Sequence, residues 1–319
     1  MTSFPSTPVP ITSYLSSPLW QLSPTASNSS AGWTPSCTDA SCVSTASWST
    51  SAVGSTATYL FWAWGHRIYG TVEGNMKLQV FRNGQEESVS PSGDVIYFFP
   101  GLPTDQYLHQ NLTIKVLEAS SGSRLIINKA EINGSTFGDI EVSKDEWKLA
   151  TNDGALQYTG FIQKSAPAGL DSPTTYVSTT AGDKMSMPQF NGSALTIYGP
   201  CGPSSGLMRV KVYQQDDVVN TTKPFQSDDC LLYQSPGMPV DRFHSLDIEN
   251  VDGRTVAITR MEFIRLNVNR QPNVVKNAGI IVGISVGVAL VIAIGILVYS
   301  TRSRKARQKF GNFWKLLCS

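Results

Sequence analysis

The feature that most constrains this chain is an uncharged, apolar segment near its C-terminus, residues 278–299. As a helix with a rise of about 1.5 Å per residue, it is about 33 Å long. The hydrocarbon core of a bilayer is about 30 Å thick, so the helix is long enough to cross it. A helix also satisfies its own backbone polar groups in lipid. The sequence therefore predicts one transmembrane helix over 278–299.

The charges beside this segment predict its orientation. The 300–319 tail has no Asp or Glu and carries six basic residues, Arg302, Arg304, Lys305, Arg307, Lys309 and Lys315. Short segments rich in Lys and Arg stay in the cytoplasm. We therefore predict a single-pass type I protein of the plasma membrane, with residues 1–277 outside, a 267–277 juxtamembrane linker and membrane lipids as partners.

The N-terminus has none of the features of an export signal. Residues 1–20 contain no Lys or Arg and no apolar run of seven residues. Three explanations stay open: the gene lacks its first exon, the sequence is trimmed, or the transmembrane helix itself acts as the signal. We favour a missing leader.

The membrane segment and the tail carry two further predictions. Gly279, Gly283 and Gly287 lie on one helix face, where small residues let two helices approach, so we expect a homodimer through the span. Cys318 follows a short apolar and basic stretch, which makes it a candidate for palmitoylation.

Cysteines and glycosylation sequons fit an extracellular location. Cys37 and Cys42 are close in sequence, and Cys201 and Cys230 form a second pair, so we predict two disulfides. Asn-x-Ser/Thr sequons, which predict N-glycans once export is accepted, occur at Asn28, Asn111, Asn133, Asn191 and Asn220.

The sequence before residue 278 predicts β-strands. Segments rich in aromatic and β-branched residues alternate with turn residues every 8–12 positions, and Asn83-Gly84 predicts a tight hairpin turn. No helical period of useful length is present before the span. This pattern is typical of an antiparallel β-sandwich.

An internal repeat predicts two copies of one β domain. Ile68-Tyr69-Gly70 recurs at 197–199, and KLQVF at 77–81 is echoed by RVKVY at 209–213. LTI at 112–114 is echoed by LDI at 246–248, and Ile127, Lys129 and Glu131 are echoed by Ile258, Arg260 and Glu262, all at nearly the same offset. We predict a loose 1–13 segment, a 14–134 domain, a 135–148 linker and a 149–266 domain.

The second copy resembles a family of membrane proteins. Its motifs are Y-x-G at 158–160, I-Y-G at 197–199, LLY at 231–233 beside Cys230, and H-x-L-x-I at 244–248. They resemble the tandem jelly-roll, galactose-binding-like ectodomains of single-pass membrane proteins from basidiomycete fungi. The resemblance implies an all-β ectodomain of two jelly rolls that works in binding or adhesion, without catalytic residues.

Sequence motifs for catalysis or metal binding are absent. There is no P-loop, no H-E-x-x-H and no G-x-G-x-x-G after a strand, so we expect neither catalytic residues nor a metal or other cofactor. Asp216-Asp217 and Asp228-Asp229 are expected in solvated loops without the spacing of a calcium site. The basic cluster lies beside the membrane, which does not support nucleic-acid binding.

The candidate ligand residues are Trp62 and Trp64, which share one face of a strand. That face is either the core or an outer surface where the rings suit sugars. We predict a non-catalytic protein of cell-surface recognition or adhesion, whose partners are extracellular glycans or surface proteins. The alternatives are a surface sensor that signals through the span and tail, and an anchored hydrolase.

Overall fold

The computed structural model describes residues 9–101, 108–134, 143–166 and 174–267, which belong to one compact unit. The predicted span, tail, Gly279, Gly283, Gly287 and Cys318 lie outside these residues. Within the described ranges, no helix is long and apolar enough to cross a membrane.

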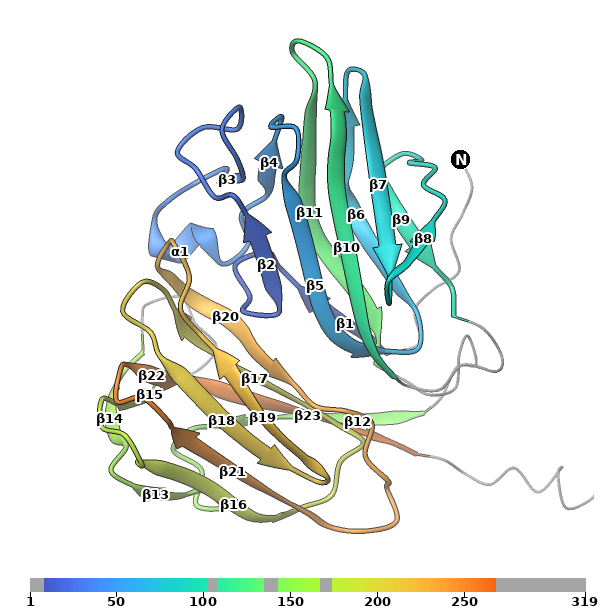
Figure 1. Ribbon diagram of the computed structural model, residues 1–319. Coiled ribbons are helices and arrows are strands. Elements are labelled where there is room, and N and C mark those ends of the chain that lie inside the picture. The colour runs from blue at the N-terminus through green and yellow to red at the C-terminus, as the bar shows by residue number, and fades with distance from the viewer. Residues whose placement is uncertain (1–8, 102–107, 135–142, 167–173, 268–319) are drawn as a thin grey trace, which may run out of the picture. The chain divides into compact units, whose positions relative to one another are not determined.

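The described chain is almost entirely antiparallel β-structure, which confirms the predicted all-β class (Figure 1). We name the strands up to β11 the first sandwich and the strands from β12 the second sandwich. A single short helix, α1 (Ala40–Val43), follows Cys37.

The first sandwich has two sheets, ordered β3-β4-β11-β6-β9, with β1 also on β11, and β2-β5-β10-β7-β8. Its strands are β1 (Pro10–Ser13), β2 (Trp20–Ser23), β3 (Thr34–Pro35), β4 (Trp48–Thr50), β5 (Thr56–Ala63), β6 (His66–Glu73), β7 (Met76–Arg82), β8 (Gln85–Glu87), β9 (Val95–Phe99), β10 (Leu108–Ala119) and β11 (Arg124–Asn133).

The second sandwich has sheets ordered β12-β23-β17-β20 and β13-β16-β21-β18-β19, with a small β14-β15-β22 sheet. Its strands are β12 (Lys144–Ala150), β13 (Gln157–Thr159), β14 (Ile162–Ser165), β15 (Thr174–Ser178), β16 (Lys184–Phe190), β17 (Ala194–Cys201), β18 (Leu207–Val212), β19 (Gln215–Asn220), β20 (Ser227–Gln234), β21 (His244–Asn250), β22 (Val256–Ile258) and β23 (Arg260–Leu266).

The two sandwiches pair their strands in the same order. The repeated Ile-Tyr-Gly lies in β6, between β11 and β9, and in β17, between β23 and β20. The order β2-β5-β10-β7-β8 likewise matches β13-β16-β21-β18-β19. This agreement supports the predicted pair of domains, although the described chain divides into no smaller units.

Two predicted boundaries are wrong. Pro10–Ser13 pairs with β11, so the ordered structure begins inside the segment predicted to be loose. Lys144–Ala150 pairs along the whole of β23, so residues 144–148 belong to the second sandwich and not to a linker. The charged residues of β12 concealed its strand character, because they alternate with Trp147 and Leu149, which pack on the core.

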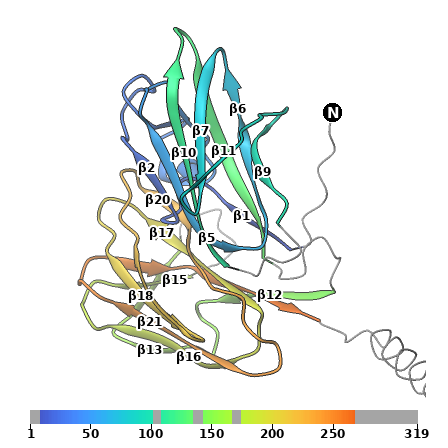
Figure 2. The ribbon, with the colours of Figure 1, turned by 45° about the vertical axis from the view of Figure 1, so that its right-hand side comes forward.

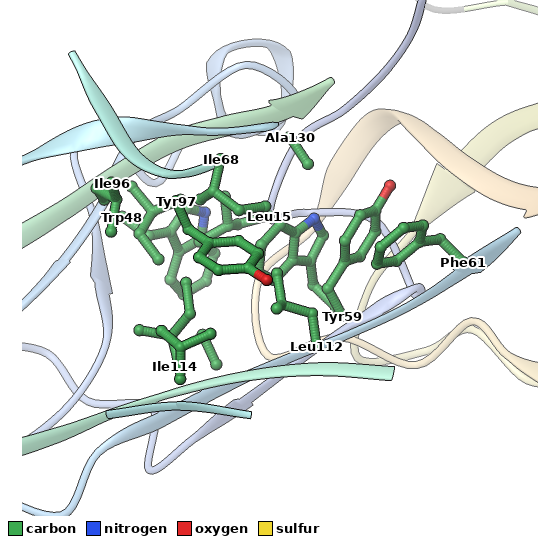
Figure 3. Close-up of a cluster of buried hydrophobic side chains, with 14 of the residues drawn as sticks. Leu15, Trp48, Tyr59, Phe61, Ile68, Ile96, Tyr97, Leu112, Ile114 and Ala130 are labelled. Carbon is green, nitrogen blue, oxygen red and sulfur yellow. The ribbon is translucent and has the colours of Figure 1, made fainter. Parts of the chain in front are cut away.

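Each sandwich has its own hydrophobic core. The first is rich in aromatic rings: Tyr59 stacks between Trp20 and Phe61, with centroid distances of 4.4 and 4.2 Å (Figure 3). The second contains five buried methionines, Met185, Met187, Met208, Met238 and Met261. Alternation along each strand places these side chains between the sheets, except for Met238, which lies between β20 and β21.

The predicted turn and both predicted disulfides are confirmed. Asn83 and Gly84 join β7 to β8 with positive φ angles of 52° and 81°, as a tight hairpin turn requires. Cys37 bonds Cys42 and Cys201 bonds Cys230. The second bond joins the adjacent strands β17 and β20.

Candidate functional site

The two candidate tryptophans point away from the core of the first sandwich. Along β5, Phe61 and Ala63 are buried, whereas Trp62 and Trp64 are half-buried on the opposite face. Of the two alternatives, the outer face is therefore correct. The two rings nevertheless have different surroundings.

Trp64 is covered by its own sandwich. A Cβ added at Gly101 would lie 2.5 Å from the Trp64 ring, so the ring rests directly on that glycine. Trp62, in contrast, lines a cavity of about 690 Å³ between the two sandwiches. The structure thus separates the pair and leaves Trp62 as the candidate ligand residue.

The cavity is bounded by the outer face of β2, β5 and β10 on one side and by β19 and β20 on the other. Its apolar lining includes Leu19, Leu22, Leu60, Trp62 and Val218, and its polar lining includes Gln21, His109, Gln215, Asp217 and Asn220. This mixture of aromatic rings and several hydrogen-bonding groups is typical of small-ligand sites.

The backbone of Trp62 is fixed by the opposite sandwich. Its N–H donates to Oε1 of Gln234 at 3.2 Å, and Nε2 of Gln234 donates to the Trp62 carbonyl at 2.5 Å. These bonds occupy the edge of β5 beyond Tyr59, where its pairing with β2 stops. The Trp62 indole also packs edge-on against the His109 ring, with the ring centroids 5.3 Å apart.

The carboxylate of Asp217 forms part of the facing wall. Its Oδ2 accepts a hydrogen bond of 3.0 Å from the hydroxyl of Tyr233, a buried residue of β20. Asp217 was expected in a loop but lies in β19, and this prediction is wrong. Val218 and Val219 after the aspartates supply the strand character.

A buried lysine closes the inner part of the cavity. Lys223 is 8% exposed, and its Nζ donates to the carbonyls of Ser17 at 3.0 Å and Trp20 at 2.7 Å. Burial lowers the pKa of this ammonium to about 7, since a low-dielectric site disfavours the charged form. The lysine joins the second sandwich to the chain that enters β2.

The second aspartate pair lies near a smaller cavity of about 220 Å³. Asp229, on β20, accepts a 2.5 Å hydrogen bond from Arg260, which also bonds Glu262 at 3.0 Å and lies over the Tyr198 ring. The loop prediction for Asp228-Asp229 is therefore wrong as well. Asp216 pairs with Arg209 and Lys211, so one acid of each pair neutralises basic neighbours.

The predicted glycan sites differ in exposure. Asn28, Asn111 and Asn220 are exposed and Asn191 is half-buried. Asn133 is only 5% exposed, and this burial argues against a glycan there. Among the described residues, no group of three or more His, Cys, Asp or Glu could hold a metal ion.

Sequence reasoning found Trp62 but missed the groups around it. Gln234, Asp217 and Lys223 are more than 150 positions away from it; Asp217 was considered only as half of an acidic pair in a loop, and no motif marks the other two. The one available signal was the isolated lysine between two turn segments, which by itself says nothing about burial.

No family model matches the chain, and no curated protein matches it. The chain is similar to the solved structure of a family two carbohydrate esterase from Cellvibrio japonicus, at 11% identity and a TM-score of 0.27, over 39% of this chain and 34% of that one. It is also similar to a Paenibacillus xanthan lyase, at 11% identity and a TM-score of 0.30, over 73% of this chain and 25% of that one. The chain thus spans only a quarter to a third of these proteins, and scores this low carry no functional argument.

Proposed function

We propose that this chain is a non-catalytic recognition protein of the cell surface, in which two tandem jelly rolls hold a carbohydrate in the cavity beside Trp62. The observation that carries the proposal is the half-buried Trp62 ring in a cavity of about 690 Å³ lined with polar side chains. Small-ligand sites occupy about 300–1,000 Å³. The matching strand orders of the two sandwiches support the tandem arrangement.

The chemistry of the wall suits a sugar better than a purely apolar ligand. An indole face packs well against the C–H face of a sugar ring, because the π-system attracts weakly positive edges. Asp217, Gln215 and His109 offer both acceptors and donors to hydroxyl groups around that ring.

The proposed location is the plasma membrane, with the described residues outside and the apolar 278–299 segment as anchor. The exposed Asn28, Asn111 and Asn220 support an extracellular position, as do the two disulfides. The glycan would then belong to a neighbouring cell, the wall or another surface protein.

A glycan array probed with the full chain in lipid nanodiscs tests the carbohydrate proposal. Trp62→Ala should weaken binding to the selected glycans about tenfold or more, which corresponds to at least about 1.4 kcal/mol. Trp64→Ala is the matched control, because Trp64 shares the strand face but lies against Gly101. Absence of any glycan binding, or equal losses in both variants at unchanged melting temperature, would contradict the proposal.

A further inference from the structure

Two exposed aromatic residues lie close together at one end of the second sandwich. Phe243, just before β21, is 63% exposed, and Tyr213, in the turn between β18 and β19, is 37% exposed. They are the aromatic members of the exposed large hydrophobic residues in the described part of the chain. His244 follows Phe243 in the chain, and its ring meets the Tyr213 ring edge-on, with the ring centroids 5.4 Å apart. Arg242, beside Phe243, is 60% exposed and pairs with the exposed Asp241 at 3.3 Å. We name Tyr213, Arg242 and Phe243 the aromatic tip.

The aromatic tip shares its end of the sandwich with the last strand. His244 pairs with Phe190 at the end of β16, and the nearby Ser193 accepts a backbone hydrogen bond from Met238. The hydroxyl of Ser193 also accepts a hydrogen bond from the N–H of Leu266, where β23 ends. Figures 1 and 2 show the end of β23 at the same side as the end of β18 and the start of β21.

The conformation of Tyr213 is unusual. It has a φ angle of 56°, in the left-handed region that bulky side chains avoid. The equivalent hairpin turn of the first sandwich, between β7 and β8, has Asn83 at this position, a residue suited to such a φ. A tyrosine that is both strained and exposed suggests that its side chain contacts another molecule and does not serve the fold itself.

The length of chain after the second sandwich limits what can cover this end. The apolar segment begins at 278, and the connecting residues 267–277 reach at most about 40 Å when fully extended. The end of the sandwich where β23 stops at Leu266 is the one tethered closest along the chain to the proposed anchor. Aromatic rings are enriched at membrane interfaces, and a basic side chain there can contact lipid phosphates.

We propose that the aromatic tip rests on the outer surface of the membrane, with Phe243 and Tyr213 at the headgroup boundary and Arg242 beside lipid phosphates. This inference rests on the membrane location proposed above, but not on carbohydrate binding. The exposed sequons agree with it: Asn220 is at the opposite end of β19 from Tyr213, and Asn28 and Asn111 belong to the first sandwich. Asn191 lies at the same end and is half-buried, and a glycan there would contradict the placement of the tip on the membrane.

A site-specific fluorescent label tests the tip in the full chain. In a Cys318→Ser background, Phe243→Cys is labelled with an environment-sensitive dye and reconstituted into vesicles of phosphatidylcholine and phosphatidylserine. Two controls of similar exposure are Ile162→Cys, at 58% and paired with Val177 away from this end, and Val53→Cys, at 63% in the first sandwich. We expect a blue shift, and quenching by headgroup-level nitroxide lipids, at position 243 alone.

The outcomes separate the tip from the proposals on which it stands. Vesicles that float without the protein would overturn both the membrane location and the tip. Flotation with equal spectra at 243 and 162 would overturn the tip alone. A blue shift at 243 that persists in lipid-free detergent and grows with protein concentration would identify a second copy as the occupant, which also overturns it. Tyr213→Asn, the residue of the equivalent turn, should keep the fold and reduce the quenching at 243.

Discussion

The two sandwiches share one strand order but fill their interiors in different ways. The first packs Trp20, Tyr59 and Phe61 in a continuous stack between its sheets. The second has five buried methionines and a disulfide between two strands of one sheet. Rigid rings fit one arrangement, whereas flexible methionine side chains adapt to irregular spaces. The comparison teaches that a repeated topology requires the same positions to be apolar but not the same side chains to fill them.

The largest expected effect is in the aromatic stack. Phe61→Ala removes a ring that is 1% exposed and should lower the free energy of unfolding by about 3–5 kcal/mol. In the second core, Met208→Leu nearly conserves the volume of a fully buried side chain and should cost less than about 1.5 kcal/mol. Denaturant unfolding of the full chain in detergent measures both. A loss above about 1.5 kcal/mol for Met208→Leu would show that the second core is packed as specifically as the first.

The disulfides give the next contrast. Replacing Cys201 and Cys230 by Ser opens a loop with a sequence separation of 29, which should lower the free energy of unfolding by about 3.6 kcal/mol. For Cys37 and Cys42, with a separation of 5, the same estimate is about 2.2 kcal/mol. Thermal unfolding of the two double variants, compared with the reduced wild-type chain, checks the ranking. A reversed order would mean that the α1 loop contributes more than chain entropy.

The sequence predicted the parts of the fold that depend on local pattern. Alternation along β5, the Asn83-Gly84 turn and the repeated Ile-Tyr-Gly are readable because each needs only neighbouring residues. The errors at β1, β12, β19 and β20 have one cause: charged or proline-containing segments become strands when a partner strand is present. No local pattern shows that partner.

The cavity depended on contacts that a single sequence does not reveal. Trp62 was identifiable from its alternation with Trp64, but its separation from Trp64 is due to Gly101 and Gln234. Lys223 acquires its burial from Ser17 and Trp20, more than 200 positions earlier. Such long-range pairs depend on how the sandwiches pack.

The last residue of the repeated Ile-Tyr-Gly, Gly70 in one sandwich and Gly199 in the other, tests whether the two sandwiches are equivalent at this position. A Cβ at Gly70 would lie 2.0 Å from the Ile126 carbonyl oxygen, and one at Gly199 would lie 2.1 Å from that of Ala257. Both Gly→Ala variants should therefore lose about 1–3 kcal/mol through backbone displacement. Gly192→Ala is the control, since its nearest neighbour is 3.6 Å away. Unequal losses at Gly70 and Gly199 by chemical denaturation would contradict the equivalence.

The smallest predicted effect concerns His66, which takes the position two residues before Ile-Tyr-Gly that Leu195 takes in the second sandwich. His66 is 3% exposed among Phe61, Tyr97 and Phe99, and neither ring nitrogen has a hydrogen-bond partner within the described residues. Burial, and secondarily the charge of Arg82, lowers the pKa of His66 to about 3 from its usual 6.5. The unfolded chain therefore takes up a proton below pH 6.5 that the folded chain takes up only near pH 3.

This difference makes the first sandwich less stable in acid. Between pH 6.5 and 5.5 the free energy of unfolding should fall by about 1 kcal/mol through His66, and the loss continues toward pH 3. His66→Leu, which copies the residue of the second sandwich, should remove this component and raise stability at pH 7, because two unsatisfied nitrogens disappear. Denaturant titrations of both proteins at pH 7.0, 6.5, 6.0 and 5.5 measure the slope. If the free energy of unfolding has the same dependence on pH with and without the histidine, His66 is protonated or hydrated in the folded chain. Water would then have more access to the core of the first sandwich than its ring stacking implies.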